Sequence, residues 1–246
     1  MRFLRLVKFD LVESILKKPG LDFSLFVMPV VLLYILGSIT EGNYTGGFSS
    51  YGYYAIGLII YFQLSTGMTA ANTFMEEKVK KPNLRLIYAP INKYQIVLSK
   101  IVSTYIASLI SLLESMILFK LLFKVEFGEH PEIVFLMFSS LALLSITLAV
   151  LVCIIVKDEG TTNMLFNIII TLFALLGGVL FQVDNLGKIV SKISDFCPVK
   201  WIMNSVFRMI YDGNYNNVLP ILLGITFISI VIAGICKVTF KTEDFV

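Results

Sequence analysis

The sequence predicts an all-α integral membrane protein with six transmembrane helices, and its composition and apolar stretches carry this prediction. Hydrophobic residues make up 57% of the 246 residues and charged residues only 15%, whereas a soluble domain carries roughly 25% charged residues. Uncharged apolar stretches recur along the chain, each about long enough to cross a hydrocarbon core of about 30 Å at about 1.5 Å per residue. Backbone polar groups in lipid must be satisfied within each segment, so these stretches are helices. Residues 1–246 are expected to form one membrane domain.

Residues 1–18 are predicted to form an amphipathic helix that lies in the membrane interface. Apolar side chains recur every four residues in this stretch: Phe3, Val7, Leu11 and Ile15. The charged side chains fall largely on the other faces, and Pro19 with Gly20 ends the helix. The alternative is that residues 1–18 form a soluble helix that precedes the first span.

The six predicted spans are residues 23–40, 51–71, 94–123, 133–156, 161–183 and 219–236. Their orientation follows from lysine and arginine, which favour the cytoplasmic side. With the N-terminus in the cytoplasm, fourteen of the 20 basic residues lie on that side. The six others are Lys120, Lys124, Lys188, Lys192, Lys200 and Arg208. We therefore expect a multi-pass protein of the cell (plasma) membrane with both termini cytoplasmic.

Residues 184–218, between spans five and six, are too amphipathic for a flexible loop. One predicted helical face carries Ile202, Val206, Met209 and Ile210, and another carries Asn204, Arg208 and Asp212. We expect an external hairpin of two short re-entrant helices that dip into the outer leaflet, with Trp201 and Tyr211 at the interface. The alternative is a surface helix resting on the headgroups.

The residues that catalysis requires are missing from the sequence. No G-x-x-x-x-G-K-[ST] phosphate-binding motif is present, so the chain is not expected to hydrolyse ATP by the usual route. One histidine, His130, and three distant cysteines, Cys153, Cys197 and Cys236, offer no catalytic triad, metal site or disulfide framework. The predicted spans are also nearly bare of the ionisable relays that a secondary transporter or pump needs. We expect a non-enzymatic permease without a cofactor of its own, driven from elsewhere.

Glu114, in the outer half of the third span, admits two interpretations. Hydroxyl side chains near it form a weakly polar stripe at helical spacing: Thr104, Ser108, Ser111 and Ser115. This face either lines a translocation path or packs against neighbouring helices, with the hydroxyls bonded to carbonyls. In the second case Glu114 reaches outward or pairs with Arg208 or Lys120.

The polar residues of the fifth span favour helix packing over contact with a cargo. Asn163 and Asn167 are four residues apart and share a face, and Gln182 lies further along. Gly177 and Gly178 permit either a close helix approach or a break where the span leaves the membrane.

Residues 74–100 form a polar, basic interruption between the second and third spans. Its charges and prolines are Glu76, Glu77, Lys78, Lys80, Lys81, Pro82, Arg85, Pro90, Lys93 and Lys100. Leu84, Leu86, Ile87 and Tyr88 stand beside these charges, as a docking helix requires and a mobile loop does not. The alternative is a basic loop held against anionic headgroups, where each lysine is worth about 1 kcal/mol.

Three stretches resemble the ABC-2 family of permeases, the membrane subunits of type V ATP-binding-cassette exporters. Residues 1–18 look like the family's cytoplasmic elbow helix. A family pattern that starts with acidic residues is similar to the stretch EEKVKKPNLRLIYAPINKYQIVLSK. The family's external helical hairpin resembles LLGGVLFQVDNL followed by FCPVKWIMNSVFRMIYDG. This sequence departs from the family at Arg85, where an acidic residue is common, and at Gln182 and Gly187, where prolines are common.

The resemblance implies that residues 74–92 form a cytoplasmic coupling helix seated in a groove of a separate ATPase subunit. The coupling residues would be Glu76, Glu77, Leu84, Arg85, Leu86, Tyr88 and Pro90. ATP and Mg²⁺ would bind that partner and not this chain. The resemblance also implies a second permease copy, or a similar chain, meeting this one through spans one and five. Membrane lipid is a further expected partner, and nucleic acid is not.

We therefore expect the permease subunit of an ATP-driven exporter. The charge-poor, aromatic-rich spans favour an amphipathic cargo, such as an antimicrobial peptide, a drug or a lipid-like molecule, so that efflux and antimicrobial resistance are the expected roles. The competing hypothesis is a membrane protein that works without an ATPase, such as a secondary carrier or a toxin-immunity factor.

Overall fold

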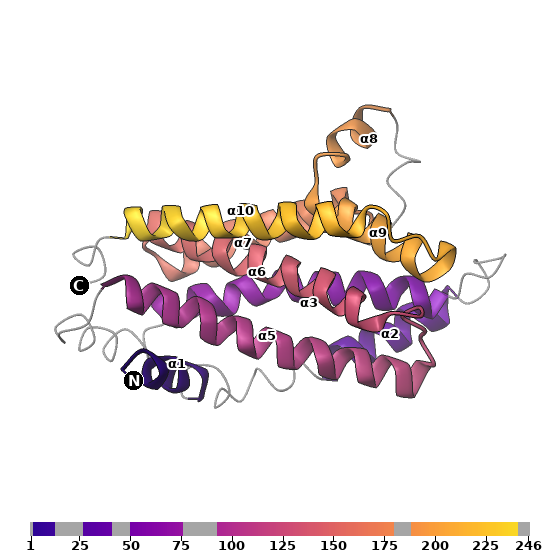
Figure 1. Ribbon diagram of the computed structural model, residues 1–246, viewed down its shortest axis with the longest axis horizontal. Coiled ribbons are helices and arrows are strands. Elements are labelled where there is room, and N and C mark those ends of the chain that lie inside the picture. The colour runs from indigo at the N-terminus through magenta and orange to yellow at the C-terminus, as the bar shows by residue number, and fades with distance from the viewer. Residues whose placement is uncertain (1, 13–26, 41–49, 76–92, 180–187, 241–246) are drawn as a thin grey trace.

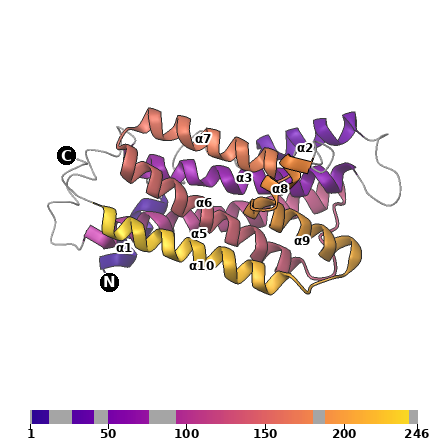
Figure 2. The same cartoon turned by 90° about the horizontal axis from the view of Figure 1, so that it is seen from above.

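The computed structural model describes residues 2–12, 27–40, 50–75, 93–179 and 188–240. Helices and their connections account for all of these residues, with no strand among them, so the predicted all-α class is confirmed. The long helices run side by side along one axis as an elongated bundle (Figure 1). Seen from above in Figure 2, α7 and α10 lie along opposite edges of the bundle.

In the described part of the chain, five helices are long and apolar enough to cross a membrane. They are α3 (Ser50–Met75), α5 (Lys93–Phe123), α6 (Pro131–Val156), α7 (Glu159–Leu176) and α10 (Val218–Thr239). Four of them lie within a few residues of the predicted bounds, whereas α7 ends at Leu176 and not at Val183. The first predicted span is represented by α2 (Met28–Ile39), which has 12 residues and a length of about 18 Å. Residues 23–26 of that span lie outside the described part of the chain.

Helices α3 and α6 form the centre of the bundle. Two-thirds of the most apolar window of each (67%) is buried inside the protein, compared with 22% for α7 and 17% for α10. Small residues allow the central helices to approach closely. A Cβ atom on Gly67 of α3 would lie 2.7 Å from the Ser145 carbonyl oxygen of α6 and 2.6 Å from the Phe166 ring of α7. The outer faces of α7 and α10 remain apolar and exposed, as lipid contact requires.

The N-terminal helix α1 (Arg2–Phe9) packs against α5 with a face that differs from the predicted one. Leu6, Val7 and Asp10 are buried, whereas Phe3 and Leu11 are only half-buried. The buried face is therefore rotated toward Leu6 and Asp10, because an acidic side chain on this face finds a basic partner on α5. Residues 13–18 of the predicted helix lie outside the described part.

Residues 188–212 contain two short helices, α8 (Lys188–Ser194) and α9 (Pro198–Asp212). The apolar face expected for α9 packs inward through Ile202, Val206 and Met209. Asn204, Arg208 and Asp212 of its polar face are exposed. Figure 1 shows α8 projecting away from the bundle beside α9. Whether this pair enters the outer leaflet remains a prediction.

Candidate functional site

The predicted coupling residues Glu76, Glu77, Leu84, Arg85, Leu86, Tyr88 and Pro90 all lie within residues 76–92, outside the described residues. The chain enters this segment from the end of α3 and leaves it at the start of α5. Both helix ends are described, and polar contacts join them to each other. The candidate functional site is therefore built from the residues that border the segment.

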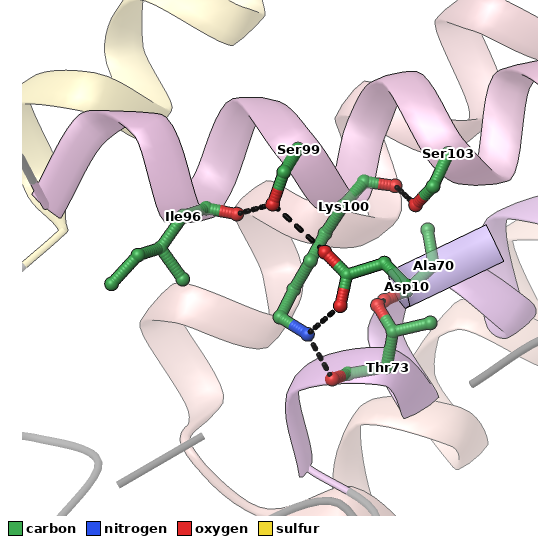
Figure 3. A network of polar contacts seen from close by, with 7 residues as sticks. All are labelled: Asp10, Ala70, Thr73, Ile96, Ser99, Lys100 and Ser103. Atoms are coloured by element: carbon green, nitrogen blue, oxygen red, sulfur yellow. Dashed lines mark hydrogen bonds and ion pairs between the residues drawn. The ribbon is translucent and has the colours of Figure 1, made fainter. Parts of the chain in front are cut away.

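Lys100 lies at the centre of this site, with its side chain completely buried. It is the eighth residue of α5, about 10 Å from the start of the helix. Its ammonium group donates to the Thr73 carbonyl oxygen of α3 at 2.7 Å and to Asp10 Oδ1 at 3.4 Å (Figure 3). The Phe74 ring centroid lies 5.3 Å from Lys100 Nζ, within the range of a cation–π contact.

Asp10 comes from the residues that follow α1, and only 2% of its side chain is exposed. Its second oxygen, Oδ2, accepts a hydrogen bond of 2.8 Å from the Ser99 hydroxyl. Ser99 precedes Lys100 on α5, so consecutive residues contact the two oxygens of one carboxylate (Figure 3). We call Asp10, Thr73, Phe74, Ser99 and Lys100 the Asp10–Lys100 junction.

The junction satisfies groups that would otherwise be costly to bury. A charge buried in low dielectric is tolerated when it is paired and hydrogen-bonded. The last four carbonyls of a helix have no partner within the helix, and a cation near them interacts favourably with the helix dipole. Thr73 lies in the last turn of α3, so Lys100 satisfies one of these carbonyls while neutralising Asp10. The junction therefore connects α1, α3 and α5 at one point.

Three consecutive residues at the end of α3 contact three different helices. The Ala71 carbonyl accepts a weak hydrogen bond of 3.8 Å from Cys153 Sγ of α6. Asn72 Oδ1 accepts a bond of 2.9 Å from Asn163 Nδ2 of α7. Thr73 is bonded to Lys100 of α5, as described above. The helix end that leads into residues 76–92 is therefore held from three sides.

The start of α5 is held in a similar way by the C-terminal helix. Lys237 Nζ of α10 lies 4.7 Å from the ring centroid of Tyr94, the second residue of α5. The rings of Phe74 and Phe240 lie 6.4 Å apart, which adds an apolar contact between α3 and the end of α10. A displacement of residues 76–92 would therefore reach the whole bundle through these two helix ends.

The residues predicted for a translocation path lie inside the chain's own bundle. Ser108, Ser111 and Ser115 are buried on α5, and Glu114 is half-buried. Ser108 donates to the Tyr105 carbonyl of its own helix at 2.8 Å. Thr104 is buried as well, and its hydroxyl has no hydrogen-bond partner among the described residues. A role of these residues in a path remains a prediction.

The polar residues and glycines of the fifth predicted span lie in different surroundings. Asn163 forms the hydrogen bond to Asn72 already described, whereas Asn167 is exposed. Gly177 lies where α7 meets α9, because a Cβ there would lie 2.3 Å from Val199 Cγ1. Gly178 has φ of +77° and ends the helix. The two glycines thus provide both a close approach and a break. Gln182 lies outside the described residues.

Sequence reasoning missed Asp10 and assigned Lys100 no partner. A usable signal was present, because Asp10 follows Leu6 and Val7 at helical spacing on the face that packs inward. No group of three or more His, Cys, Asp or Glu residues suited to a metal ion occurs in the described part of the chain. The three cysteines are buried and free.

The bundle of long apolar helices defines a multi-pass membrane protein. The chain belongs to the family of ABC-2 family transporter proteins, whose model matches residues 34–236. Members of this family are membrane subunits of transporters and are generally non-catalytic, and the family in general implies an ATP-binding-cassette ATPase as partner.

One curated relative is the linearmycin resistance permease protein LnrN of Bacillus subtilis (strain 168). It is 23% identical over 187 residues, which cover 76% of this chain. The match covers 48% of the relative, so the chain spans about half the length of that protein. The match supports the same conclusion as the family model, that this chain is a transporter membrane subunit.

Proposed function

We propose that this chain is the permease subunit of an ATP-driven exporter, powered by a separate ATPase that binds ATP and Mg²⁺. Membership of the ABC-2 family supports the class of the partner. Residues 74–92 are the proposed docking segment, and the proposed topology places this segment and both termini in the cytoplasm. A second permease copy, or a similar chain, completes the pathway.

The Asp10–Lys100 junction is the observation that carries the proposal. The junction links α3, which ends before the docking segment, to α5, which begins after it. It also links α5 to Asp10, which follows α1. A partner that changes shape on binding ATP shifts a conformational equilibrium only through contacts that differ between two states. Residues 76–90 would make those contacts, and the junction would pass the displacement to α3, α5 and α1 together.

The proposed cargo is amphipathic: an antimicrobial peptide, a drug or a lipid-like molecule. The spans carry few charges, which disfavours an ion. The relative described above is named a resistance permease, which supports efflux of a toxic compound. Growth of cells that express both subunits, in the presence of candidate compounds, measures this directly.

The test of the docking segment uses substitutions on its charged and apolar residues. Glu77→Lys and Leu84→Asp are each expected to reduce cargo export at least tenfold and to reduce the amount of ATPase that co-purifies with the tagged permease. The amount of permease in the membrane should stay the same, since the changes lie outside the spans. Glu129→Lys, in the exposed connection between α5 and α6, is the matched control and should change neither quantity.

Three results would overturn the proposal. Unchanged export in both Glu77→Lys and Leu84→Asp would remove the docking assignment. Export by the purified permease in vesicles without any ATPase would instead favour a secondary carrier. Toxin protection without any export would favour an immunity factor.

A further inference from the structure

A groove lies at the opposite end of the bundle from the Asp10–Lys100 junction, between α2 and the ends of α3 and α5. Its volume is about 640 Å³, within the range of about 300–1,000 Å³ that small-molecule sites occupy. Its lining residues are Val30, Val31, Tyr34, Tyr51, Leu122, Phe123 and Lys124. Among the described residues of this lining, Lys124 is the charged one and the others are apolar or aromatic.

Packed aromatic rings and a glycine contact fix the groove's floor. The rings of Tyr51 and Phe123 stack with centroids 5.5 Å apart. Tyr51 also packs against Gly37 of α2 so closely that a Cβ on Gly37 would lie 2.3 Å from the Tyr51 ring. Ser50 donates to the Gly37 carbonyl at 3.1 Å, which ties α2 to the start of α3. The floor is therefore formed by contacts within the chain.

The walls of the groove are open toward the surface. The side chains of Val31, Tyr34 and Leu122 are 44%, 62% and 59% exposed. In a membrane these side chains face acyl chains and not water, because they belong to the apolar helices α2 and α5. A groove that opens sideways into the hydrocarbon region and is lined by apolar side chains fits an acyl chain.

The length of α5 fits a position of Lys124 at the depth of the lipid headgroups. Helix α5 has 31 residues and a length of about 46 Å, close to the thickness of about 40–45 Å of a bilayer with its headgroup regions. Lys124 follows its last residue and is exposed. Its backbone has φ of +54°, a left-handed conformation that glycine adopts with less strain. Lys124 thus has a strained backbone conformation at a position that suits contact with a lipid phosphate.

We propose that this groove binds an anionic phospholipid of the adjacent leaflet. One acyl chain lies along Val30, Val31 and Tyr34, and the phosphate contacts the Lys124 ammonium. Burial of the acyl chain is favourable because the groove is apolar, and a lysine near an anionic surface attracts its phosphates. Charge complementarity favours such a lipid over an apolar helix of a second copy, which would leave Lys124 without an anionic partner. The site requires that the chain lies in a membrane and that a second copy contacting span one leaves this face of α2 open; it does not depend on the proposed export.

Native mass spectrometry of the purified full chain in mild detergent tests the proposal, with phosphatidylglycerol and phosphatidylcholine of matched acyl chains as probes. Wild-type protein should retain phosphatidylglycerol about fivefold more tightly, since one lysine contributes about 1 kcal/mol. Lys124→Gln should abolish this preference. Val31→Trp, at a half-exposed position, should fill the groove and reduce retention of both lipids. Lys192→Gln, on an exposed lysine of α8, is the matched control and should change neither.

Lys124→Gly separates lipid binding from a structural role of the lysine. It removes the ammonium group and the backbone strain together, so the preference for phosphatidylglycerol should disappear while thermal stability is kept or raised. Equal retention of both lipids by the wild type would overturn the proposal. So would an equal effect of Lys192→Gln, which indicates non-specific attraction. Unchanged retention in Val31→Trp would show that another occupant, such as residues 41–49 or a second copy, fills the groove.

Discussion

The two ends of the bundle hold their charges in opposite ways. At the end that borders residues 76–92, the side chains of Asp10 and Lys100 are 2% and 0% exposed and join three segments of chain. At the end near α9, Lys200 and Asp195 form an ion pair of 3.0 Å in which Asp195 is 63% exposed. Solvent screens the second pair and not the first, so only the first fixes the relative positions of helices. The comparison indicates that the buried pair is better suited than the exposed pair to transmit a displacement between helices.

The largest expected effect is the loss of the buried lysine. Lys100→Met removes the cation and leaves the Asp10 carboxylate buried without it, which typically costs about 3–5 kcal/mol in the free energy of unfolding. The double variant Asp10→Leu with Lys100→Met replaces both charges with apolar groups and should recover most of that loss. Denaturant titration of the purified protein in detergent measures both values.

The exposed pair provides the control for this measurement. Asp195→Asn should change the free energy of unfolding by less than about 1 kcal/mol, because Lys200 keeps its hydrogen bond of 2.7 Å to Ser194 Oγ. If Lys100→Met costs no more than Asp195→Asn, the contrast between the two ends is wrong.

A smaller effect is expected at the close approach between α7 and α9. Gly177→Ala places a Cβ 2.3 Å from Val199 Cγ1 and 2.7 Å from the Phe173 carbonyl oxygen, and such overpacking typically costs about 1–3 kcal/mol. The matched control is Gly224→Ala in α10, where nothing lies within 4 Å of the new Cβ. This change should stabilise the protein by about 0.5–1 kcal/mol, because alanine is the better helix former. Thermal unfolding measures the stability of both variants. Equal melting temperatures would contradict the expected difference between the crowded position 177 and the open position 224.

Much of the fold follows from properties that are local in the sequence. The uncharged stretches 51–71, 94–123, 133–156 and 219–236 predict helices because span length and hydropathy need no knowledge of neighbours. The amphipathic pattern around Ile202 and Val206 predicts α9 and its inward face for the same reason. The glycines at 177 and 178 left a close approach and a break open as alternatives, and the structure has the first at Gly177 and the second at Gly178.

The junction was not predicted, because its parts are distant in the sequence. Lys100 and Asp10 are separated by 90 positions, and outside the junction the bonded pair Asn72 and Asn163 is separated by 91. Periodicity assigns each residue to a helix face but does not say which face it meets. The rotation of α1 toward Asp10 is the clearest case, since a pattern of apolar residues alone favoured Phe3, Val7 and Leu11. The stripe around Ser108 remains ambiguous, because both interpretations place hydroxyls on one helix face.

The central claim is that residues 76–92 face the cytoplasm, where an ATPase subunit reaches them. Labelling of Arg85→Cys with a membrane-impermeant maleimide tests it most directly, and the three native cysteines contribute little background because they are buried. A control variant, Glu129→Cys in the exposed α5–α6 connection, should react in intact cells. Arg85→Cys should react only after the membrane is permeabilised. Reaction of Arg85→Cys in intact cells would place the segment outside and contradict the account.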